Sequence, residues 1–530
     1  MTATATLAAP QADAGLNPRR WVVLAVLCTS LATVMVANAS LNNALPAMAE
    51  QLHASTSSLQ WIVDAYSLVF AGLLFTAGSL GDRFGRKGAL QLGLGIFLLG
   101  ALSGAMSGSA TAVIASRGVM GLGAAFIMPA TLSIIVNIFP SSERPRAIAI
   151  WTAIAGAGGA FGPLASGLLL ERFAWNSVFL VNVPIVLLAL FAGLRIVPTS
   201  RDHNATRIDG LGALLSIIGI GTLVYAIIEA PSHGWMSPST AVAFGTAIAF
   251  LGAFVWWELR TPVPMLNLRW FQHRALSVGS AGMMLSFFAL YGMMFLLTQY
   301  LQLVHGFSPL GAAIRLLPIA AVMIVVSPQA PRLVARFGAH RVVGTGLSVL
   351  AFGTLMLSRV GVTTPYAVLV LPMIVMVAGM SVSMAPLTNA IMSGVPRDRA
   401  GVGSAMNDTT RELGGALGVA VLGSLLTSQY ASSLSSSLSG LPAGARSAAS
   451  SSLAGALQVA SQLGPQGTTL ADAAKHAYVD GMGVALFVGA IVIGVAAVLA
   501  RKLMPADVED ADHAAVLEPT DDLELELLSA

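Results

Sequence analysis

The feature that most constrains this chain is a series of fourteen apolar stretches, each long enough to cross a lipid bilayer as a helix. A membrane-spanning helix needs roughly 20 mainly apolar residues. Charged residues make up only 10% of the sequence and hydrophobic residues 56%, whereas soluble proteins carry about 25% charge. The sequence therefore predicts an all-α integral membrane protein. Its stretches lie at 21–45, 59–80, 89–107, 110–139, 147–170, 177–197, 209–230, 240–258, 277–304, 310–331, 342–358, 363–395, 401–427 and 479–500.

The lysine and arginine residues test this count and orient the chain. When the N-terminus is placed in the cytoplasm, most of the 27 such residues fall in cytoplasmic segments. Those in outside segments are Arg172, Arg359, Arg446 and Lys475. Cytoplasmic loops carry an excess of these residues, so we expect both termini in the cytoplasm and the chain in a bacterial inner membrane. The net charge of +3 then reflects this orientation, and no nucleic-acid partner is expected.

A short internal repeat indicates how the spans are organised. Arg83-Phe84-Gly85 follows the second stretch and Arg336-Phe337-Gly338 follows the tenth, although Ala335 stands where the first copy has Asp82. Transporters are often built from repeats, with the substrate site between them near mid-membrane. We expect a cytoplasmic tail, two six-helix bundles separated by two inserted helices, an outside loop with short helical patterns such as 446–462, and an acidic cytoplasmic tail. The cytoplasmic tail is expected at 1–20, the two bundles at 21–197 and 277–500, and the inserted helices at 209–258. The outside loop is expected at 428–478 and the acidic tail at 501–530.

Motifs at matching places in this topology resemble those of one transporter family. The segment Gly78–Lys87 is similar to the cytoplasmic signature of the major facilitator superfamily, and Arg117–Gly121 to its arginine motif. Gly158–Gly167 resembles the Gly-Pro motif of its antiporters. The resemblance implies the major facilitator fold. The fourteen spans are similar to the EmrB/QacA type of drug/proton antiporter, as are Leu45-Pro46, Trp61–Tyr66 and Gly401–Ala405.

Two of these motifs carry expected roles in conformational change. The resemblance implies that Asp82 latches one state by meeting the start of the thirteenth span near Ala400, although a simple topology anchor or a helix cap by Asp82 stays open. The resemblance also implies that the Gly-Pro motif at 158–167 seals the substrate path against proton leak, although small residues at these positions also serve close helix packing. The latch consists of Gly81, Asp82, Arg83, Gly85 and Arg86, and the antiporter-like kink of Gly158, Gly162, Pro163 and Gly167.

Charged residues inside the spans are the strongest functional signal. Each costs about 2.5–3.5 kcal/mol at a helix centre, so such residues are usually functional. Asp64 and Arg117 lie at similar depth and could pair, whereas Asp408 and Glu412 share one helix face, with Arg411 beside them. We expect proton coupling through at least one of the acids Asp64, Asp408 and Glu412. The expected charge partners are Arg117, Arg315 and Arg411, and a static ion-pair network that locks the helices is the alternative.

The first span departs from the family pattern where a substrate would bind. That pattern reads Leu-Asp-x-Thr, two apolar residues, then Asn-Val-Ala-Leu-Pro, but here Ala37 replaces the aspartate, and Asn38, Asn42 and Asn43 do not titrate. This argues against a strong preference for cationic drugs. The substrate-cavity candidates are Asn38, Asn42, Trp61, Tyr66, Phe288 and Tyr291. Helix–helix hydrogen bonding by the asparagines, and lipid contact by the Met and aromatic residues of 277–304, are the alternatives.

The motifs that are missing narrow the function. The sequence contains no Gly-x-x-x-x-Gly-Lys-Ser/Thr phosphate loop, no His/Cys metal spacing and no catalytic constellation. We therefore expect a non-enzyme without cofactors that uses a proton gradient to export amphipathic drugs or toxic compounds. The alternatives are a dedicated exporter of an endogenous antibiotic, lipid or siderophore and, remotely, a non-transporting membrane sensor. The expected partners are the small amphipathic molecule, protons and membrane lipid; an accessory periplasmic protein stays open.

Overall fold

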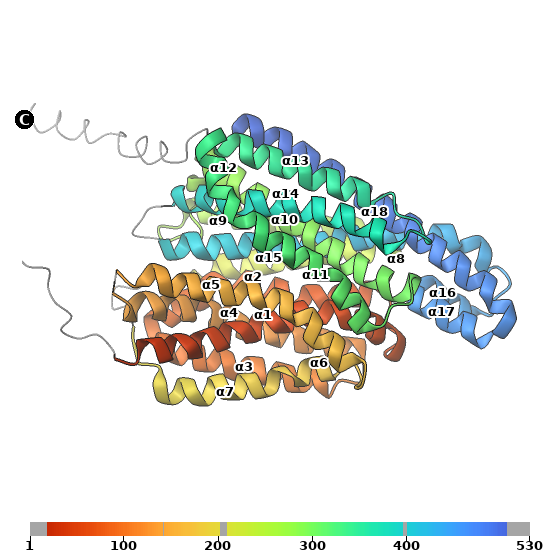
Figure 1. Cartoon of the computed structure of the whole chain (residues 1–530), viewed down its shortest axis with the longest axis horizontal. Coiled ribbons are helices and arrows are strands. Elements are labelled where there is room, and N and C mark those ends of the chain that lie inside the picture. The colour runs from red at the N-terminus through yellow and green to blue at the C-terminus, as the bar shows by residue number, and fades with distance from the viewer. Residues whose placement is uncertain (1–17, 141, 202–208, 396–399, 506–530) are drawn as a thin grey trace, which may run out of the picture.

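The computed structural model describes residues 18–140, 142–201, 209–395 and 400–505, and helices make up most of this part. Within it, fourteen helical segments are long and apolar enough to cross a membrane, and the same residues contain no β-strand. The predicted number of spans and the all-α fold are confirmed. Figure 1 shows the N-terminal half in red to yellow below the C-terminal half in green to blue.

The N-terminal half is a bundle of six spans. Ser55 and Ser109 cap two of its helices by accepting backbone N–H groups of the first turn, which are otherwise without partners. A Cβ on Gly121 would lie 2.4 Å from the Tyr66 carbonyl oxygen, so only glycine lets the fourth helix lie directly against the second. The helices are α1 (Arg20–Gln51), α2 (Thr56–Phe84), α3 (Arg86–Ala105), α4 (Ala110–Ile138), α5 (Arg144–Leu170), the short α6 (Ser177–Leu180) and α7 (Asn182–Ile196).

The C-terminal half repeats this plan, and its last two spanning helices, with 35 and 37 residues, are longer than any of the N-terminal half. A Cβ on Gly414 would lie 2.1 Å from the Met284 carbonyl oxygen, so the helix that carries Asp408 and Glu412 packs closely on the first helix of its own half. The elements are η1 (Leu268–Gln272), α10 (Arg274–Gln299) with the π-helical turn η2 (Tyr300–Val304), α11 (Pro309–Val326), η3 (Ser327–Gln329), α12 (Ala330–Phe337), α13 (Ala339–Leu357), α14 (Tyr366–Ser393), α15 (Ala400–Leu434) and α18 (Gly467–Leu503).

Two inserted helices, α8 (Gly210–His233) and α9 (Pro238–Arg260), connect the halves. Helix α8 packs against both α2 and α15, and α9 packs on α8. The Ser424 hydroxyl of α15 donates to the Ile227 carbonyl oxygen of α8 at 2.8 Å. The inserted pair therefore covers one edge of the line along which α2 meets α15.

The outside segment 428–478 contains the expected short helices, and long helices extend into it from both sides. Helix α15 continues to Leu434, and α18 begins at Gly467. The intervening elements are η5 (Ser435–Leu438), α16 (Ala443–Ser451), α17 (Leu453–Gln462) and η6 (Gly464–Gln466), which cover the pattern expected at 446–462. Apolar residues of α17 are buried, which explains why a segment rich in Ser, Ala and Gly still folds. Figure 1 places α16 and α17 together beyond one end of the bundles.

The two halves meet along two helix pairs, α2 with α15 and α5 with α11. Among the described residues, the hydrogen bonds between the halves all lie on the outer side of the molecule. They run from Thr56, which donates to the Ser451 carbonyl oxygen at 3.1 Å, to Ser67 near the middle of α2, which donates to Glu412 at 2.8 Å. The structure is therefore closed toward the outside.

Candidate functional site

A line of polar side chains runs along the face of α2 that meets α15. Gln60 Nε2 donates to the carbonyl oxygens of Val419 at 3.0 Å and Ala420 at 2.9 Å. One turn further along α2 lies Asp64, and after it Ser67, whose hydroxyl donates to Glu412 Oε2 at 2.8 Å. The halves of the molecule are thus joined through side chains that include the Glu412 carboxyl group, and Asp64 lies on the same face of α2 between these contacts.

Asp64 is the most isolated charged group of this line. Its side chain is 0% exposed, and neither carboxyl oxygen has a hydrogen-bond partner. An ionised carboxylate in such surroundings costs much free energy unless it is paired. A carboxyl group held in this way is suited to binding and releasing a proton.

The expected pair of Asp64 with Arg117 is wrong in this structure. Arg117 is also 0% exposed, but its Nε donates to the Ile62 carbonyl oxygen at 3.1 Å and its guanidinium carbon lies 4.3 Å from the Tyr66 ring centroid. Ile62 and Tyr66 are four residues apart and share a face of α2, whereas Asp64 lies two residues from each and points to the opposite side. The two charges have similar depth but lie on different faces of the helix.

The acids of α15 separate into two environments. Arg411 Nη1 lies 3.5 Å from Asp408 Oδ1, and its guanidinium carbon lies 4.6 Å from the Phe287 ring centroid. Glu412 is 7% exposed and reaches across to Ser67 instead. Asp408 therefore has a cationic partner within its own helix, while Glu412 belongs to the contact between the halves.

Arg315 does not join these acids, in contrast to its expected role as a charge partner. Its guanidinium carbon lies 3.6 Å from the Phe307 ring centroid and 5.4 Å from that of Tyr366, and Nη1 donates to the Gly311 carbonyl oxygen at 3.0 Å. These residues surround the outer end of α11. Among the described residues, Arg315 has no ion pair.

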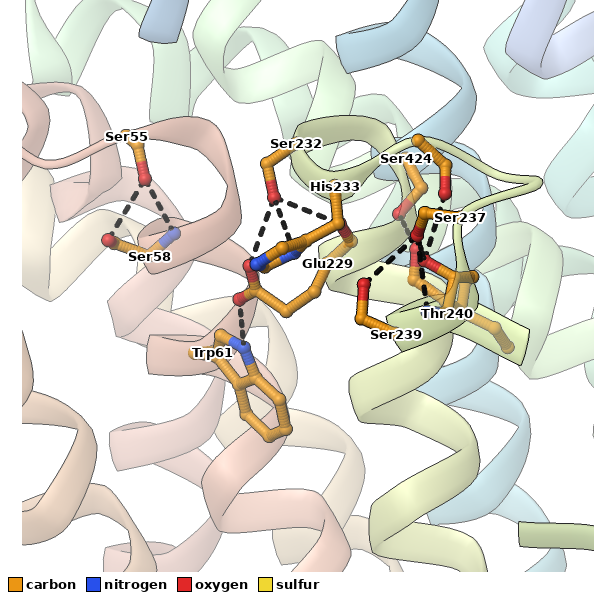
Figure 2. Close-up of polar contacts among 12 residues, drawn as sticks. Ser55, Ser58, Trp61, Glu229, Ser232, His233, Ser237, Ser239, Thr240 and Ser424 are labelled. Carbon is orange, nitrogen blue, oxygen red and sulfur yellow. Dashed lines mark hydrogen bonds and ion pairs between the residues drawn. The ribbon is translucent and has the colours of Figure 1, made fainter. Parts of the chain in front are cut away.

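The substrate-cavity candidates of the N-terminal half lie in two different environments. Asn38 Oδ1 accepts from Arg117 Nη2 at 3.3 Å, and Asn42 Oδ1 is buried without a partner. Trp61, by contrast, donates its Nε1 hydrogen to Glu229 Oε1 of the inserted helix α8 at 3.1 Å. Figure 2 shows the indole below the Glu229 carboxylate, which Ser232 also contacts. Asn38 and Tyr66 thus lie beside Arg117, whereas Trp61 contacts the inserted helix α8.

The candidates of α10 pack inside the C-terminal half. Phe288 is 7% exposed, and Tyr291 lies against α15, where a Cβ on Gly415 would come within 2.2 Å of its ring. Met283 and Met293 are 0% exposed. The alternative that the Met and aromatic residues of this span simply face lipid is therefore wrong for these members.

Asn43, to which the sequence analysis assigned no role, joins the halves at the α5–α11 contact. It is 1% exposed, and its Nδ2 donates to the Pro163 carbonyl oxygen of α5 at 3.3 Å and to the Pro309 carbonyl oxygen of α11 at 3.1 Å. Gln302 Nε2 donates to Asn43 Oδ1 at 2.8 Å. The signal was present in the sequence, because Asn43 stands where the family pattern has valine.

The glycines of the antiporter-like kink bring α5 against two neighbours. A Cβ on Gly158 would lie 2.6 Å from Met35 Cβ, and one on Gly162 would lie 2.7 Å from Ala39 Cβ, so both positions pack α5 on α1. Gly167 faces α11, where a Cβ would lie 2.9 Å from Leu310 Cα. Pro163 lies between them inside α5. The motif thus serves packing within one half and between the halves.

The latch residues form a tight turn between α2 and α3. Gly85 has φ 126°, a backbone conformation that favours glycine, and its counterpart Gly338 has φ 80°. Asp82 Oδ1 lies 2.7 Å from Arg86 Nε, and Gly85, without a side chain, is the N-cap of α3. Asp82 is therefore not the cap of α3. The segment 396–399, near the expected partner of Asp82, lies outside the described residues, so the latch stays a prediction.

Comparison with known proteins decides the family of this fourteen-span chain. The family model described as Major Facilitator Superfamily matches residues 22–419. The chain belongs to the Major Facilitator Superfamily. It is accordingly a multi-pass inner-membrane protein of a transporter family. Among solved structures, the superfamily fold is represented by a bacterial homologue of the human lysosomal transporter Spinster, with a TM-score of 0.66, 18% identity, and coverage of 92% of this chain and 98% of the other.

Curated members of the superfamily are closer in sequence. The multidrug resistance protein Stp of Mycobacterium tuberculosis is 37% identical over 409 residues, which cover 77% of this chain and 76% of Stp. The tetracenomycin C resistance and export protein of Streptomyces glaucescens is 32% identical over 502 residues and is matched over 93% of both chains. The first is named for several drugs and the second for one compound.

Proposed function

We propose that this protein exports amphipathic drugs or toxic compounds across the inner membrane in exchange for protons. Its relatives in the superfamily, named for multidrug resistance and for antibiotic export, support the direction and the substrate class. The observation that carries the proton coupling is the position of Asp64 and Glu412. Both are buried where α2 meets α15, the surface that separates when the molecule opens to the outside.

The proposed coupling follows from this position. In the closed arrangement, Asp64 lacks partners and Glu412 accepts the Ser67 hydroxyl. Opening α2 from α15 breaks that bond and brings both carboxyl groups into contact with outside water, where each can take up a proton. A neutral carboxyl group is cheaper to bury than a carboxylate, so protonation favours return to the closed state. Release of the proton toward the cytoplasm completes the exchange.

The energy available to such an exchange is sufficient for export. One charge that crosses the membrane yields about 2.3 kcal/mol per 100 mV. Because about 1.4 kcal/mol corresponds to a factor of ten in concentration, one net charge supports roughly a fifty-fold gradient. We propose that the proton gradient is the only energy source and that no cofactor takes part.

A dedicated exporter of one endogenous product is the second candidate. Ala37 stands where the family pattern has an aspartate, and the polar group closest to this position in sequence, Asn38, is bonded to the cation Arg117. An arginine beside Asn38 disfavours a strongly cationic substrate and favours neutral or anionic amphipathic compounds. The match to the tetracenomycin C exporter over 93% of the chain points the same way.

Transport in proteoliposomes tests both proposals. The full-length protein would be reconstituted and supplied with an imposed pH gradient, and movement of a fluorescent lipophilic cation and of a neutral polycyclic compound would be measured. Asp64→Asn and Glu412→Gln are compared with Glu258→Gln, which changes a carboxyl group that is 3% exposed but lies on α9. We expect gradient-driven transport in wild type and the control, and its loss in the two interface variants.

The outcomes separate the candidates. Transport of the neutral compound without the cation favours the dedicated exporter, and transport of both favours the multidrug exporter. If both interface variants respond to the gradient as wild type does, the proposed coupling site is wrong. Absence of any gradient-dependent movement in wild type across a panel of neutral, cationic and anionic compounds would contradict proton-coupled export itself.

A further inference from the structure

The outer end of the C-terminal half holds a cationic group that the transport mechanism does not use. Arg315 lies between the rings of Phe307 and Tyr366, with Nε buried and without a partner. His305 also stacks on Phe307, at 5.5 Å between ring centroids, and its Nε2 is likewise buried without a partner. Two nitrogen atoms are therefore left unsatisfied within one aromatic cluster.

The local electrostatic potential at this cluster is positive. Burial lowers the pKa of His305, and the positive charges of Arg315 and Lys475 lower it further. Within the described part of the chain, neither Arg315 nor Lys475 has an ion pair. Glu171, a carboxylate on the same side of the molecule, accepts the Ser308 hydroxyl at 2.8 Å. The cluster thus lacks the anion that would balance it.

The depth of Arg315 places it at the level of lipid headgroups. The span that contains it, Pro309–Phe337, has 29 residues, or about 43 Å at roughly 1.5 Å per residue. A bilayer is about 40–45 Å thick with its headgroups and about 30 Å without them. Arg315 lies six residues from the outer end, about 9 Å in, and its bond to the Gly311 carbonyl oxygen shows that the side chain turns back toward the outside.

The cluster also lies beside an exposed apolar surface of α11. Arg315 itself is partly exposed, and its neighbours Ile314 and Leu317 are 49% and 38% exposed. An exposed apolar surface on a spanning helix is suited to contact with acyl chains. A guanidinium group offers several N–H donors in a geometry that fits phosphate oxygens, and the Phe307 ring holds it in place by a cation–π contact.

We propose that Arg315, with His305 and Lys475 beside it, binds the phosphate group of an outer-leaflet phospholipid at the edge between α11 and α14. The guanidinium supplies the hydrogen bonds, Lys475 adds charge, and the lipid chains lie along the exposed apolar face of α11. This proposal does not rest on the direction or the substrate of transport.

Lipid binding to the purified full-length protein tests the proposal. Detergent-solubilised wild type would be titrated with short-chain phosphatidylglycerol, with phosphatidic acid and with inorganic phosphate, and binding would be followed by native mass spectrometry and by the shift in Tm. Arg315→Gln is compared with Arg359→Gln, an exposed arginine on the same side. Because hydrogen bonds to charged groups contribute strongly, we expect Arg315→Gln to weaken phospholipid binding about tenfold or more and Arg359→Gln to leave it unchanged.

A second variant guards against a folding artefact. Arg315→Lys keeps the charge but removes the forked donors, and should bind the same lipid several-fold more weakly while it remains monodisperse in size-exclusion chromatography. Equal lipid binding by wild type and Arg315→Gln would overturn the proposal. So would an equal shift with inorganic phosphate alone, because the site would then take a free anion rather than a lipid.

Discussion

Helix α2 meets α15 through Gln60 and Ser67, with Asp64 on the same face between them, whereas α5 meets α11 through Gly167 and through Asn43, which bridges them from α1. The first contact contains two buried carboxyl groups, Asp64 and Glu412. The second contains an amide, a close-packed glycine and backbone carbonyl oxygens, and at its outer end the exposed Glu171 carboxylate accepts the Ser308 hydroxyl. Both contacts join the same two halves on the outer side of the molecule.

The two contacts occupy equivalent places in the repeat. Helix α2 and the α11–α12 span each end in an Arg-Phe-Gly turn, and the glycine has positive φ in both. If span 10 corresponds to span 2, then span 13, which is α15, corresponds to span 5, which is α5. The two helix pairs are therefore related by the repeat, yet only the α2–α15 contact buries carboxyl groups, because Glu171, at the outer end of the α5–α11 contact, is exposed. We infer that protons act on the α2–α15 contact and that the α5–α11 contact responds mechanically.

The largest expected effect is that of Asp64→Asn. It keeps the size and polarity of the side chain but removes the group without partners in the α2–α15 contact. We expect gradient-driven transport to fall to the level of liposomes without protein, because the neutral amide cannot carry a proton. The Kd for substrate, measured by fluorescence quenching, should change less than threefold. This corresponds to a change of about 0.6 kcal/mol or less in binding free energy, because Asp64 is not among the substrate-cavity candidates. Full gradient response would remove Asp64 from the mechanism.

Glu412→Gln should also reduce transport driven by the pH gradient, but by less than Asp64→Asn does. The amide oxygen still accepts the Ser67 hydroxyl, so the contact between the halves is kept. We expect the rate of transport driven by the pH gradient to fall at least about tenfold, which corresponds to about 1.4 kcal/mol. Substrate exchange without a gradient should continue. Parallel loss of both activities would instead indicate a structural role for Glu412.

Asn43→Val tests the neutral contact. The substitution restores the valine of the family pattern and removes the amide hydrogen bonds to Pro163, Pro309 and Gln302. Each net hydrogen bond contributes about 0.5–1.5 kcal/mol, so we expect a lower Tm and easier opening to the outside. Proton dependence of transport should persist. Asn42→Val is the matched control, because its Oδ1 has no partner to lose, and an equal loss of Tm in both variants would contradict the bridging role of Asn43.

The topology was predictable from the sequence for a simple physical reason. A lipid bilayer requires long apolar helices, so each span leaves a signal of about 20 residues, and the positive charges at its ends fix its direction. The outside segment was harder, because α16 and α17 are short and rich in Ser and Ala, and their burial depends on contacts such as Tyr430 with the Ala449 carbonyl oxygen.

The site was predictable in its residues but not in their partners. Depth along a helix follows from residue number, but the partner of a charge depends on which face of the helix carries it. Asp64 and Ile62 differ by two residues and therefore lie on opposite sides of α2, which separates Asp64 from Arg117. The expected partners of Arg315 were wrong for another reason. The chain reverses at Gly306, with φ 71°, and carries Phe307 back over α11, where its ring contacts Arg315.

The smallest expected effect lies at the other end of α5, away from the contact with α11. Glu143 forms a bidentate pair with Arg20, at 2.7 and 2.9 Å, which ties the start of α5 to α1 within the N-terminal half. The hydrogen bond from Arg20 lowers the pKa of Glu143. A carboxyl group whose pKa is lowered by folding stabilises the fold above its ordinary pKa, and this contribution is lost as the pH falls through the lowered value.

Glu143→Gln should therefore lower Tm slightly at neutral pH, and the difference from wild type should shrink as the medium becomes more acidic than the ordinary range of glutamate. Because the pair lies near the surface, its effect is small. It joins helices of the same half, so proton-driven transport should keep its dependence on the gradient. Measuring Tm and transport over a pH series checks both. A change in the pH dependence of transport would mean that the neutral side of the molecule also senses protons, and the distinction between the two contacts would fail.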